Sequence, residues 1–227
     1  GVASACRENG CALLGGETAE LPGVYREGEF DLAGFVTGLV ERTRLIDGSA
    51  VELGDQLVAL PSSGLHTNGF SLVFQVLAQS ADGKSLAERL QSEVLPSGEP
   101  LRAALLVPHR SYLRDVWPLL QLGLVRGMAH ITGGGLVDNV PRVLPAGMSA
   151  HIDLATWTPP EVFGFLQSEG QVAIQEMYRV FNMGVGMVLF VAPAHVAEVL
   201  ERIPGAWVVG DVRQGDGKVV LSRGADA

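Results

Sequence analysis

Two glycine-rich loops constrain the fold of this chain more than any other feature. Residues 62–69 (SSGLHTNG) follow the short apolar strand expected at 57–60, and residues 132–135 (TGGG) follow the strand expected at 124–131. Each loop precedes apolar residues at helical spacing. Glycines allow a tight turn between a strand and a helix, and repeated strand–loop–helix units are typical of α/β domains. The loops therefore predict an α/β fold with mixed sheets.

Hydrophobic periodicity predicts the other elements of the same domain. Apolar residues at helical spacing predict helices at 70–77, 112–120, 136–140, 162–166 and 196–203. Short apolar runs predict further strands at 186–191, 207–209 and 219–221. The stretch 81–100 is rich in Ser, Gly, Glu and Pro, and it predicts a long surface excursion.

The first 45 residues have too little apolar pattern to fold alone. Strands are expected at 11–14 and 30–40, and two strands cannot bury enough surface to be stable. We therefore expect residues 1–45 to be the end of an N-terminal domain that upstream sequence or a partner chain completes. Polar turn dipeptides follow, so the second domain is expected to span residues 46–227.

Composition excludes several classes of protein. The 227 residues contain 16 Lys and Arg against 25 Asp and Glu, a net charge of −9, so binding to nucleic acid or to an anionic membrane is not expected. The sequence has no apolar run of about 18 residues, the length that spans a bilayer. Cys6 and Cys11 are too few for a disulfide framework or a zinc site. A cytoplasmic protein is expected.

The loop 62–69 is a candidate anion site. Asn68 or Thr67 could cap the following helix and leave its first N–H groups free for a ligand, with the titratable His66 beside them. A plain strand-to-helix turn with a capping Asn explains the same spacing equally well. No Gly-Lys-Ser/Thr follows, so the loop is not a Walker A motif.

The loop 132–135 repeats this logic. His130 ends the preceding strand, and three successive glycines would let a ligand approach the backbone closely. A flexible hinge is the alternative. Two such loops in one domain, each with a histidine, favour a functional interpretation more than either loop does by itself.

Two further stretches carry polar side chains. The carboxylates Glu17 and Glu20 lie next to a glycine pair and could bind Mg²⁺, although a solvated turn explains them as well. Arg179 and Asn182 precede a buried strand and could reach a ligand. The remaining histidines have no partner in the sequence and are expected at the surface or at helix ends: His109, His151 and His195.

Five blocks in a fixed order resemble the aminoimidazole ribonucleotide synthetase family, whose activity is also called phosphoribosylformylglycinamidine cyclo-ligase. The blocks are residues 15–23 (GGETAELPG), 62–72 (SSGLHTNGFSL), 130–135 (HITGGG), 141–145 (PRVLP) and 177–187 (MYRVFNMGVGM). The resemblance runs from residue 1 to about residue 221. It implies a protein of two α/β domains. Roughly the N-terminal third of the family's full length is missing from this chain.

The resemblance also implies an activity. Members of this family use ATP and Mg²⁺ to convert formylglycinamidine ribonucleotide to aminoimidazole ribonucleotide, ADP and phosphate in purine biosynthesis. They are cytoplasmic homodimers that associate through the N-terminal domain. This chain by itself is expected to show little or no activity.

Individual roles follow from the same resemblance. Proton transfer is expected from His66 or His130, and substrate orientation from Asn68. Substrate and phosphate binding is expected from Ser63, Gly64, Thr67, Gly69, Thr132, Gly133, Gly134, Gly135, Arg179 and Asn182. The nucleotide is expected at Gly15, Gly16 and Thr18, with Mg²⁺ on Glu17.

Two alternatives remain open. Selenophosphate synthetase and thiamine-monophosphate kinase share the fold and the use of ATP with this family. The chain could also be a truncated, non-catalytic fragment that binds a phosphorylated ligand.

Overall fold

The computed structural model describes residues 1–79 and 83–224. Contacts within the chain divide it into two compact units, Gly1–Leu45 and Ile46–Ala227. Among the described residues, no helix combines the length and the apolar character that crossing a bilayer requires. Each unit is described separately.

The first unit has little regular structure. It contains helix α1 (Val2–Glu8) and the 3-10 turn η1 (Arg42–Arg44). The strands expected at 11–14 and 30–40 are absent from these described residues, so that prediction was wrong. The reason is the lack of a partner: Phe35 and Leu39 are 97% and 101% exposed, and an extended segment without a neighbour makes no ladder.

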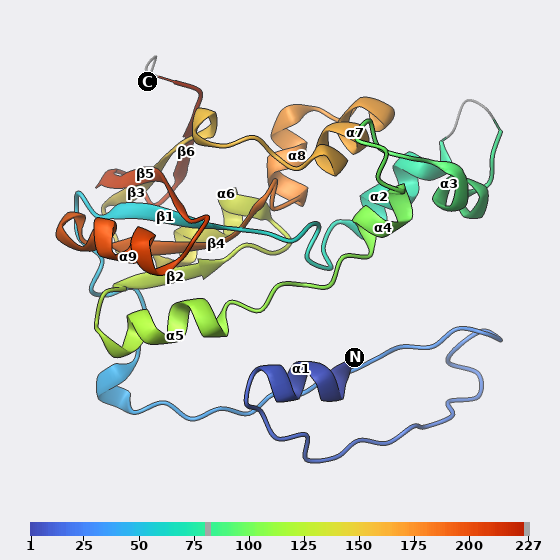
Figure 1. Ribbon diagram of the computed structural model, residues 1–227, viewed down its shortest axis with the longest axis horizontal. Coiled ribbons are helices and arrows are strands. Elements are labelled where there is room, and N and C mark those ends of the chain that lie inside the picture. The colour runs from blue at the N-terminus through green and yellow to red at the C-terminus, as the bar shows by residue number, and fades with distance from the viewer. Residues whose placement is uncertain (80–82, 225–227) are drawn as a thin grey trace. The chain divides into compact units, whose positions relative to one another are not determined.

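The second unit is built on one mixed six-stranded sheet (Figure 1) with the strand order β2-β4-β1-β5-β3-β6. The strands are β1 (Gln56–Pro61), β2 (Gly127–His130), β3 (Met148–Asp153), β4 (Val185–Val191), β5 (Trp207–Gln214) and β6 (Val219–Ser222). All neighbours are antiparallel except β3 and β6, which are parallel. The predicted α/β class with mixed strand pairing is confirmed.

Eight α-helices of this unit are described. They are α2 (Phe70–Ala78), α3 (Leu86–Ser92), α4 (Leu101–Leu105), α5 (Leu113–Gln121), α6 (Gly135–Asn139), α7 (Glu161–Gly170), α8 (Ile174–Val180) and α9 (Val196–Arg202). Short 3-10 turns are η2 (Val140–Val143), η3 (Leu154–Thr156) and η4 (Pro193–His195).

The stretch 81–100 is not the plain excursion that its composition predicts. Residues 81 and 82 lie outside the described residues, and α3 begins soon after them. Ser85 and Glu88 form a reciprocal capping box at the start of α3. Such a box satisfies two backbone N–H groups at the helix start, so a polar stretch can still form a helix.

The sheet is covered on both faces, and β1 shows how. Leu57 and Ala59 belong to one buried cluster, which also contains side chains of α2, α6, α7 and α8. Val58 and Leu60 belong to a second cluster with side chains of α5 and α9. Successive strand residues point to opposite faces, so a strand buried on both faces reads as an unbroken apolar run.

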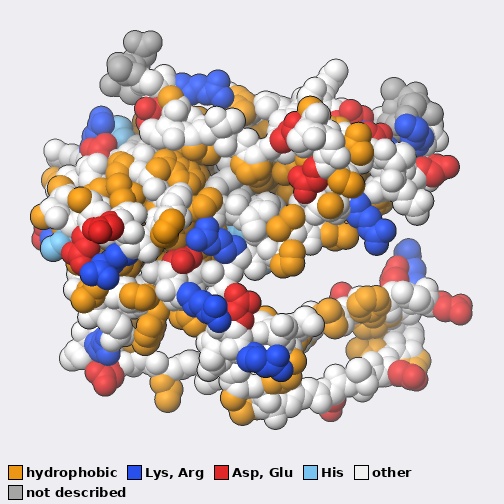
Figure 2. Space-filling model, viewed as in Figure 1, with side chains coloured by type: hydrophobic (Ala, Val, Ile, Leu, Met, Phe, Trp, Pro, Cys, Tyr) orange, Lys and Arg blue, Asp and Glu red, His pale blue; other side chains and the backbone are white. Residues whose placement is uncertain are grey.

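Charge on the visible surface is dispersed. On the face drawn in Figure 2, Lys and Arg side chains are scattered among acidic and apolar ones and do not gather into one broad patch. An anionic ligand held on this face would depend on local donors such as backbone N–H groups.

Substitution of two glycines by alanine should change the free energy of unfolding in opposite directions. A Cβ at Gly210 in β5 would overlap the carbonyl oxygen of His151 on the neighbouring strand β3, whereas a Cβ at Gly164 in α7 meets no atom within 4 Å. Gly210→Ala should lower the free energy of unfolding by about 2 kcal/mol or more. The control Gly164→Ala should raise it by about 0.5–1 kcal/mol. Urea denaturation measures both, and equal effects would contradict the packing described for β5.

Candidate functional site

The loop after β1 holds two side-chain-bearing residues in the left-handed region. His66 and Thr67 have φ values of 54° and 61°. Non-glycine residues in this region cost about 1 kcal/mol or more each and persist where local structure holds them. Asn68 Nδ2 and Thr67 Oγ1 both donate to the carbonyl oxygen of His66, at 2.7 and 2.6 Å.

The start of α2 differs from expectation. Its N-cap is Gly69, with φ of 79° and no side-chain cap, so neither Thr67 nor Asn68 caps the helix. The left-handed turn directs these two side chains back to the loop. Asn68 Oδ1 instead accepts the N–H of Gly133 at 3.0 Å. That bond joins the two glycine-rich loops, which are 65 residues apart in the chain.

The imidazole ring of His66 is held in one tautomer by the loop that carries it. The side chain is 1% exposed, and its Nε2 accepts the backbone N–H of Ser63 at 2.9 Å. Because Nε2 accepts, the ring proton of the neutral imidazole lies on Nδ1, which has no hydrogen-bond partner. Burial, and then the positive charges of His109, His130 and Arg110, lower the pKa of His66 from 6.5 to about 4.

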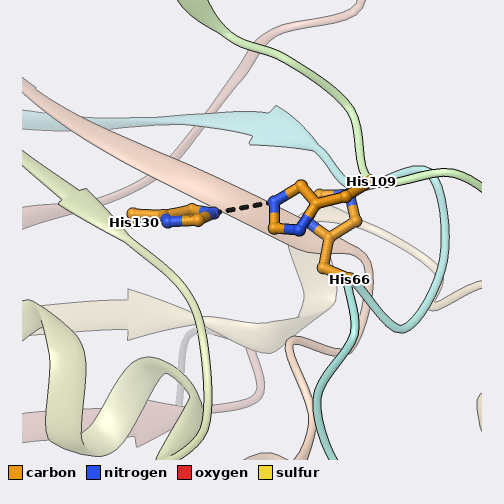
Figure 3. A group of neighbouring side chains, drawn as sticks. All are labelled: His66, His109 and His130. Carbon is orange, nitrogen blue, oxygen red and sulfur yellow. Dashed lines mark hydrogen bonds between the residues drawn. The ribbon is translucent and has the colours of Figure 1, made fainter. Parts of the chain in front are cut away.

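Three histidines from different parts of the chain meet here (Figure 3): His66, His109 and His130. The rings of His66 and His109 are stacked, with centroids 4.0 Å apart and planes 16° apart. The Nε2 atoms of His109 and His130 are 3.0 Å apart, a hydrogen-bond distance. Burial lowers the pKa of His130, and burial together with His130 lowers that of His109.

The structure thus brings together both histidines proposed for proton transfer and adds a third. His109 was expected at the surface, but it lies in the connection before α5 and is packed in the cluster. No fixed spacing relates it to His66 or His130, so nothing in the sequence could have identified it.

A pocket of about 360 Å³ opens beside the cluster. It is lined by His109 and His130 together with Tyr112, Trp117, Met128 and Met187, among others. His66 does not line it.

The neighbourhood of this pocket is fixed by polar contacts to β1. Tyr112 Oη and Arg110 both donate to the carbonyl oxygen of Pro61, at 2.9 and 3.1 Å, and Arg110 also pairs with Asp115 at 2.8 Å. Burial raises the pKa of Tyr112, so its hydroxyl remains protonated. A Cβ at Gly186 in β4 would overlap Tyr112 Oη and lie 2.7 Å from the His66 ring. Gly186, which was not among the predicted site residues, makes this approach possible.

The loop 132–135 is organised by a buried amide. Asn139 Nδ2 donates to the carbonyl oxygens of Gly135 at 2.8 Å and Gly133 at 3.2 Å, and its Oδ1 accepts the Thr132 hydroxyl at 3.2 Å. Gly135 has φ of 59°, and a Cβ there would overlap the carbonyl oxygen of Tyr178. The glycine is therefore required by the close approach of the last turn of α8.

Asn182 and Arg179 differ in position. Asn182 is buried: its Nδ2 donates to the carbonyl oxygen of Gly64 at 2.8 Å, and its Oδ1 accepts the Ser62 hydroxyl at 3.0 Å and the Gly184 N–H at 2.8 Å. Arg179 is an exposed side chain of α8, 3.8 Å from Glu176. Asn182 therefore holds the first loop in place, and Arg179 faces solvent.

The predicted nucleotide residues belong to the first unit. Gly15, Gly16, Glu17 and Thr18 are all exposed in a segment without helix or strand. The carboxylate of Glu17 is a hard oxygen donor of the kind that Mg²⁺ prefers.

The buried His66 makes stability depend on pH. Between pH 6.5 and about 4 the unfolded chain binds a proton that the folded ring does not, so the free energy of unfolding should fall as pH drops through this window. The contribution of His66 is at most about 3 kcal/mol. His66→Asn should reduce this dependence, because Asn tolerates the left-handed backbone and does not titrate. Urea unfolding at pH 7 and 4.5 measures it, with the exposed His195→Asn as control, and an unchanged dependence in His66→Asn would contradict the account.

Comparison with known proteins gives the family. The model of the family "AIR synthase related protein, C-terminal domain" matches residues 52–222. Phosphoribosylformylglycinamidine cyclo-ligase of Trichlorobacter lovleyi is 48% identical over 94% of this chain and 61% of its own length. The enzyme of the same name from Myxococcus xanthus is 49% identical over 96% of this chain and 63% of its own length. The chain thus spans about three fifths of these relatives.

A solved structure shares the fold. Thiamine-monophosphate kinase from Stenotrophomonas maltophilia matches 82% of this chain and 56% of its own, with a TM-score of 0.53 and 14% sequence identity. At that identity the likeness concerns the fold alone. From the family match, which extends from near the start of the second unit to the last strand, the chain belongs to the AIR synthase related family and carries its C-terminal domain.

Proposed function

We propose that this chain is the larger part of a phosphoribosylformylglycinamidine cyclo-ligase, which closes the ring of aminoimidazole ribonucleotide at the expense of ATP. The observation that carries the proposal is the bond from Gly133 N–H to Asn68 Oδ1, which joins two glycine-rich loops beside a histidine cluster. The names of relatives 48–49% identical to the chain support the same activity.

The proposed reaction needs two kinds of site. The formyl amide oxygen of formylglycinamidine ribonucleotide takes the γ-phosphoryl group of ATP, which turns a poor leaving group into phosphate. The amidine nitrogen then attacks the adjacent carbon and closes the imidazole ring. Both steps depend mainly on positioning, and the second also needs a group that accepts a proton.

The two loops are proposed to hold the phosphorylated substrate. Their N–H groups and hydroxyls are short-range donors, which suit an anion on a chain of net charge −9. The Ser63 and Gly133 N–H groups and the Thr67 and Thr132 hydroxyls would exchange their bonds within the protein for bonds to the ligand. The residues proposed are Ser63, Gly64, Thr67, Gly69, Thr132, Gly133, Gly134, Gly135, Arg179 and Asn182, with Asn68 orienting the substrate. Of these, Asn182 would act by holding the loop, because both ends of its amide are already bonded within the protein.

The nucleotide is proposed to lie at the first unit. Gly15, Gly16 and Thr18 would contact ATP, and the Glu17 carboxylate would hold Mg²⁺, which supplies charge neutralisation for the phosphates when bound. A cytoplasmic homodimer that associates through the N-terminal domain completes the proposal.

The activity is tested by incubating protein that contains this chain with formylglycinamidine ribonucleotide and Mg-ATP. Aminoimidazole ribonucleotide, ADP and phosphate should appear in equal amounts. ATP consumption that requires thiamine monophosphate or selenide instead would assign the protein to another branch of the superfamily. Ligand binding without any ADP would mean a non-catalytic fragment.

The Mg²⁺ role of Glu17 makes a separate prediction. Glu17→Gln should raise the Mg²⁺ concentration needed for half-maximal activity about tenfold or more, because the amide removes the charge of a ligand. Glu27→Gln is the matched control, since it alters an exposed carboxylate of the same unit that has no proposed role in metal binding. Equal Mg²⁺ requirements in the two variants would remove Glu17 from the metal site.

A further inference from the structure

The 3.0 Å contact between His109 and His130 fixes how these rings share protons. A neutral imidazole carries one proton and one free lone pair. Since both rings meet through Nε2, one ring must donate its Nε2 proton and the other must accept it. The donating ring then has its lone pair on Nδ1, where it can take up one more proton. The two rings therefore form a unit with one open proton site.

His66 has a different place in the cluster. Its Nε2 lone pair is occupied by the Ser63 N–H, so the ring cannot accept a proton there without losing that bond. It is stacked flat on His109, and it is absent from the pocket wall. His66 is therefore a positioning residue that holds the His109 ring against His130.

The same geometry argues against a three-histidine metal site. Ligand nitrogens of His66, His109 and His130 all lie within 4.8 Å of one another. A metal ion bonds to a lone pair in the plane of an imidazole ring, and the planes of His66 and His109 are nearly parallel and stacked. One ion cannot lie in both planes. The bond from Ser63 also occupies the His66 lone pair.

The surroundings of the pair limit it to one bound proton. Arg110 and Tyr112 line the same pocket, and no carboxylate is among the described residues that line it. The Arg110 charge is balanced by Asp115, and the Tyr112 hydroxyl is tied to Pro61. A second proton would place two positive charges 3.0 Å apart, which is costly in a half-buried site.

From this juxtaposition we propose that His109 and His130 act as one acid–base unit, which takes up the proton that the amidine nitrogen loses when the imidazole ring closes. The inference rests on the proposed function. In the step, the amidine nitrogen forms the C–N bond, and the C–O bond to phosphate breaks with its electron pair. The nitrogen proton passes to the free Nδ1 of the pair, and solvent in the pocket removes it afterwards.

Kinetics of the active protein test this unit. His109→Gln and His130→Gln should each lower kcat/KM by about 100-fold or more. The double variant should fall no further than either single one, because each change already breaks the hydrogen bond through which the two rings share a proton. His195→Gln is the matched control and should keep full activity. His66→Asn should lower kcat by a smaller factor and retain the acidic limb of the pH profile. Unchanged kcat/KM in His109→Gln, or losses that multiply in the double variant, would overturn the proposal.

A titration of the 227-residue chain gives a readout that does not depend on turnover. The Cε1–H resonances of His109 and His130 should each show two coupled steps, and His109→Gln should leave His130 with a single step. Independent single-step curves in the unmodified chain would overturn the proposal.

Two further outcomes separate the proposal from its alternatives. If a longer, unmodified protein that contains this chain makes no aminoimidazole ribonucleotide, the proposed function is refuted, and with it the role of the pair as base in that reaction. Coupled titration of the 227-residue chain would still establish the shared proton. Tight Zn²⁺ binding that is lost in His66→Asn, His109→Gln and His130→Gln alike would replace the acid–base unit with a metal site.

Discussion

The buried amide of Asn182 is the contact on which the site depends. It bonds to Ser62 and Gly64 in the loop after β1 and to Gly184 in the turn before β4, across a sequence separation of about 120 residues. β1 and β4 are antiparallel neighbours, so the amide closes the end of a strand pair that runs through both buried clusters. The loop in turn places His66 in its left-handed turn, and the His66 ring stacks on the ring of His109.

The central strands were predictable because of where they lie. β1 and β4 are covered on both faces, so their residues are apolar throughout, and the runs in the sequence stand out. β3 was missed because Ser149, His151 and Asp153 interrupt its apolar pattern. α8 has no clear helical pattern in the sequence, since only Met177 and Tyr178 of its residues are buried. The strands expected in residues 1–45 are not formed, although their sequence is apolar, because these apolar residues have no neighbouring strand to pair with.

The candidate site was predictable in part. A glycine-rich loop indicates a tight turn, so both loops and the histidines within or beside them could be identified from the sequence. His109 lies 21 residues before His130 in a connection with no motif, and only the folded chain brings the two together. The roles of Asn139 and Gly186 also become visible only in the folded chain. Asn139 organises a loop through its amide, and Gly186 leaves out the side chain that would occupy the space of the Tyr112 hydroxyl.

We propose that both glycine loops and the histidine pair form one ligand site. The most direct measurement is a titration of ¹⁵N-labelled chain with aminoimidazole ribonucleotide, followed by amide chemical shifts. The account predicts that amides of 63–69 and 133–135 shift together with one saturation curve. Shifts confined to one loop, or centred on a remote element such as α9, would contradict it.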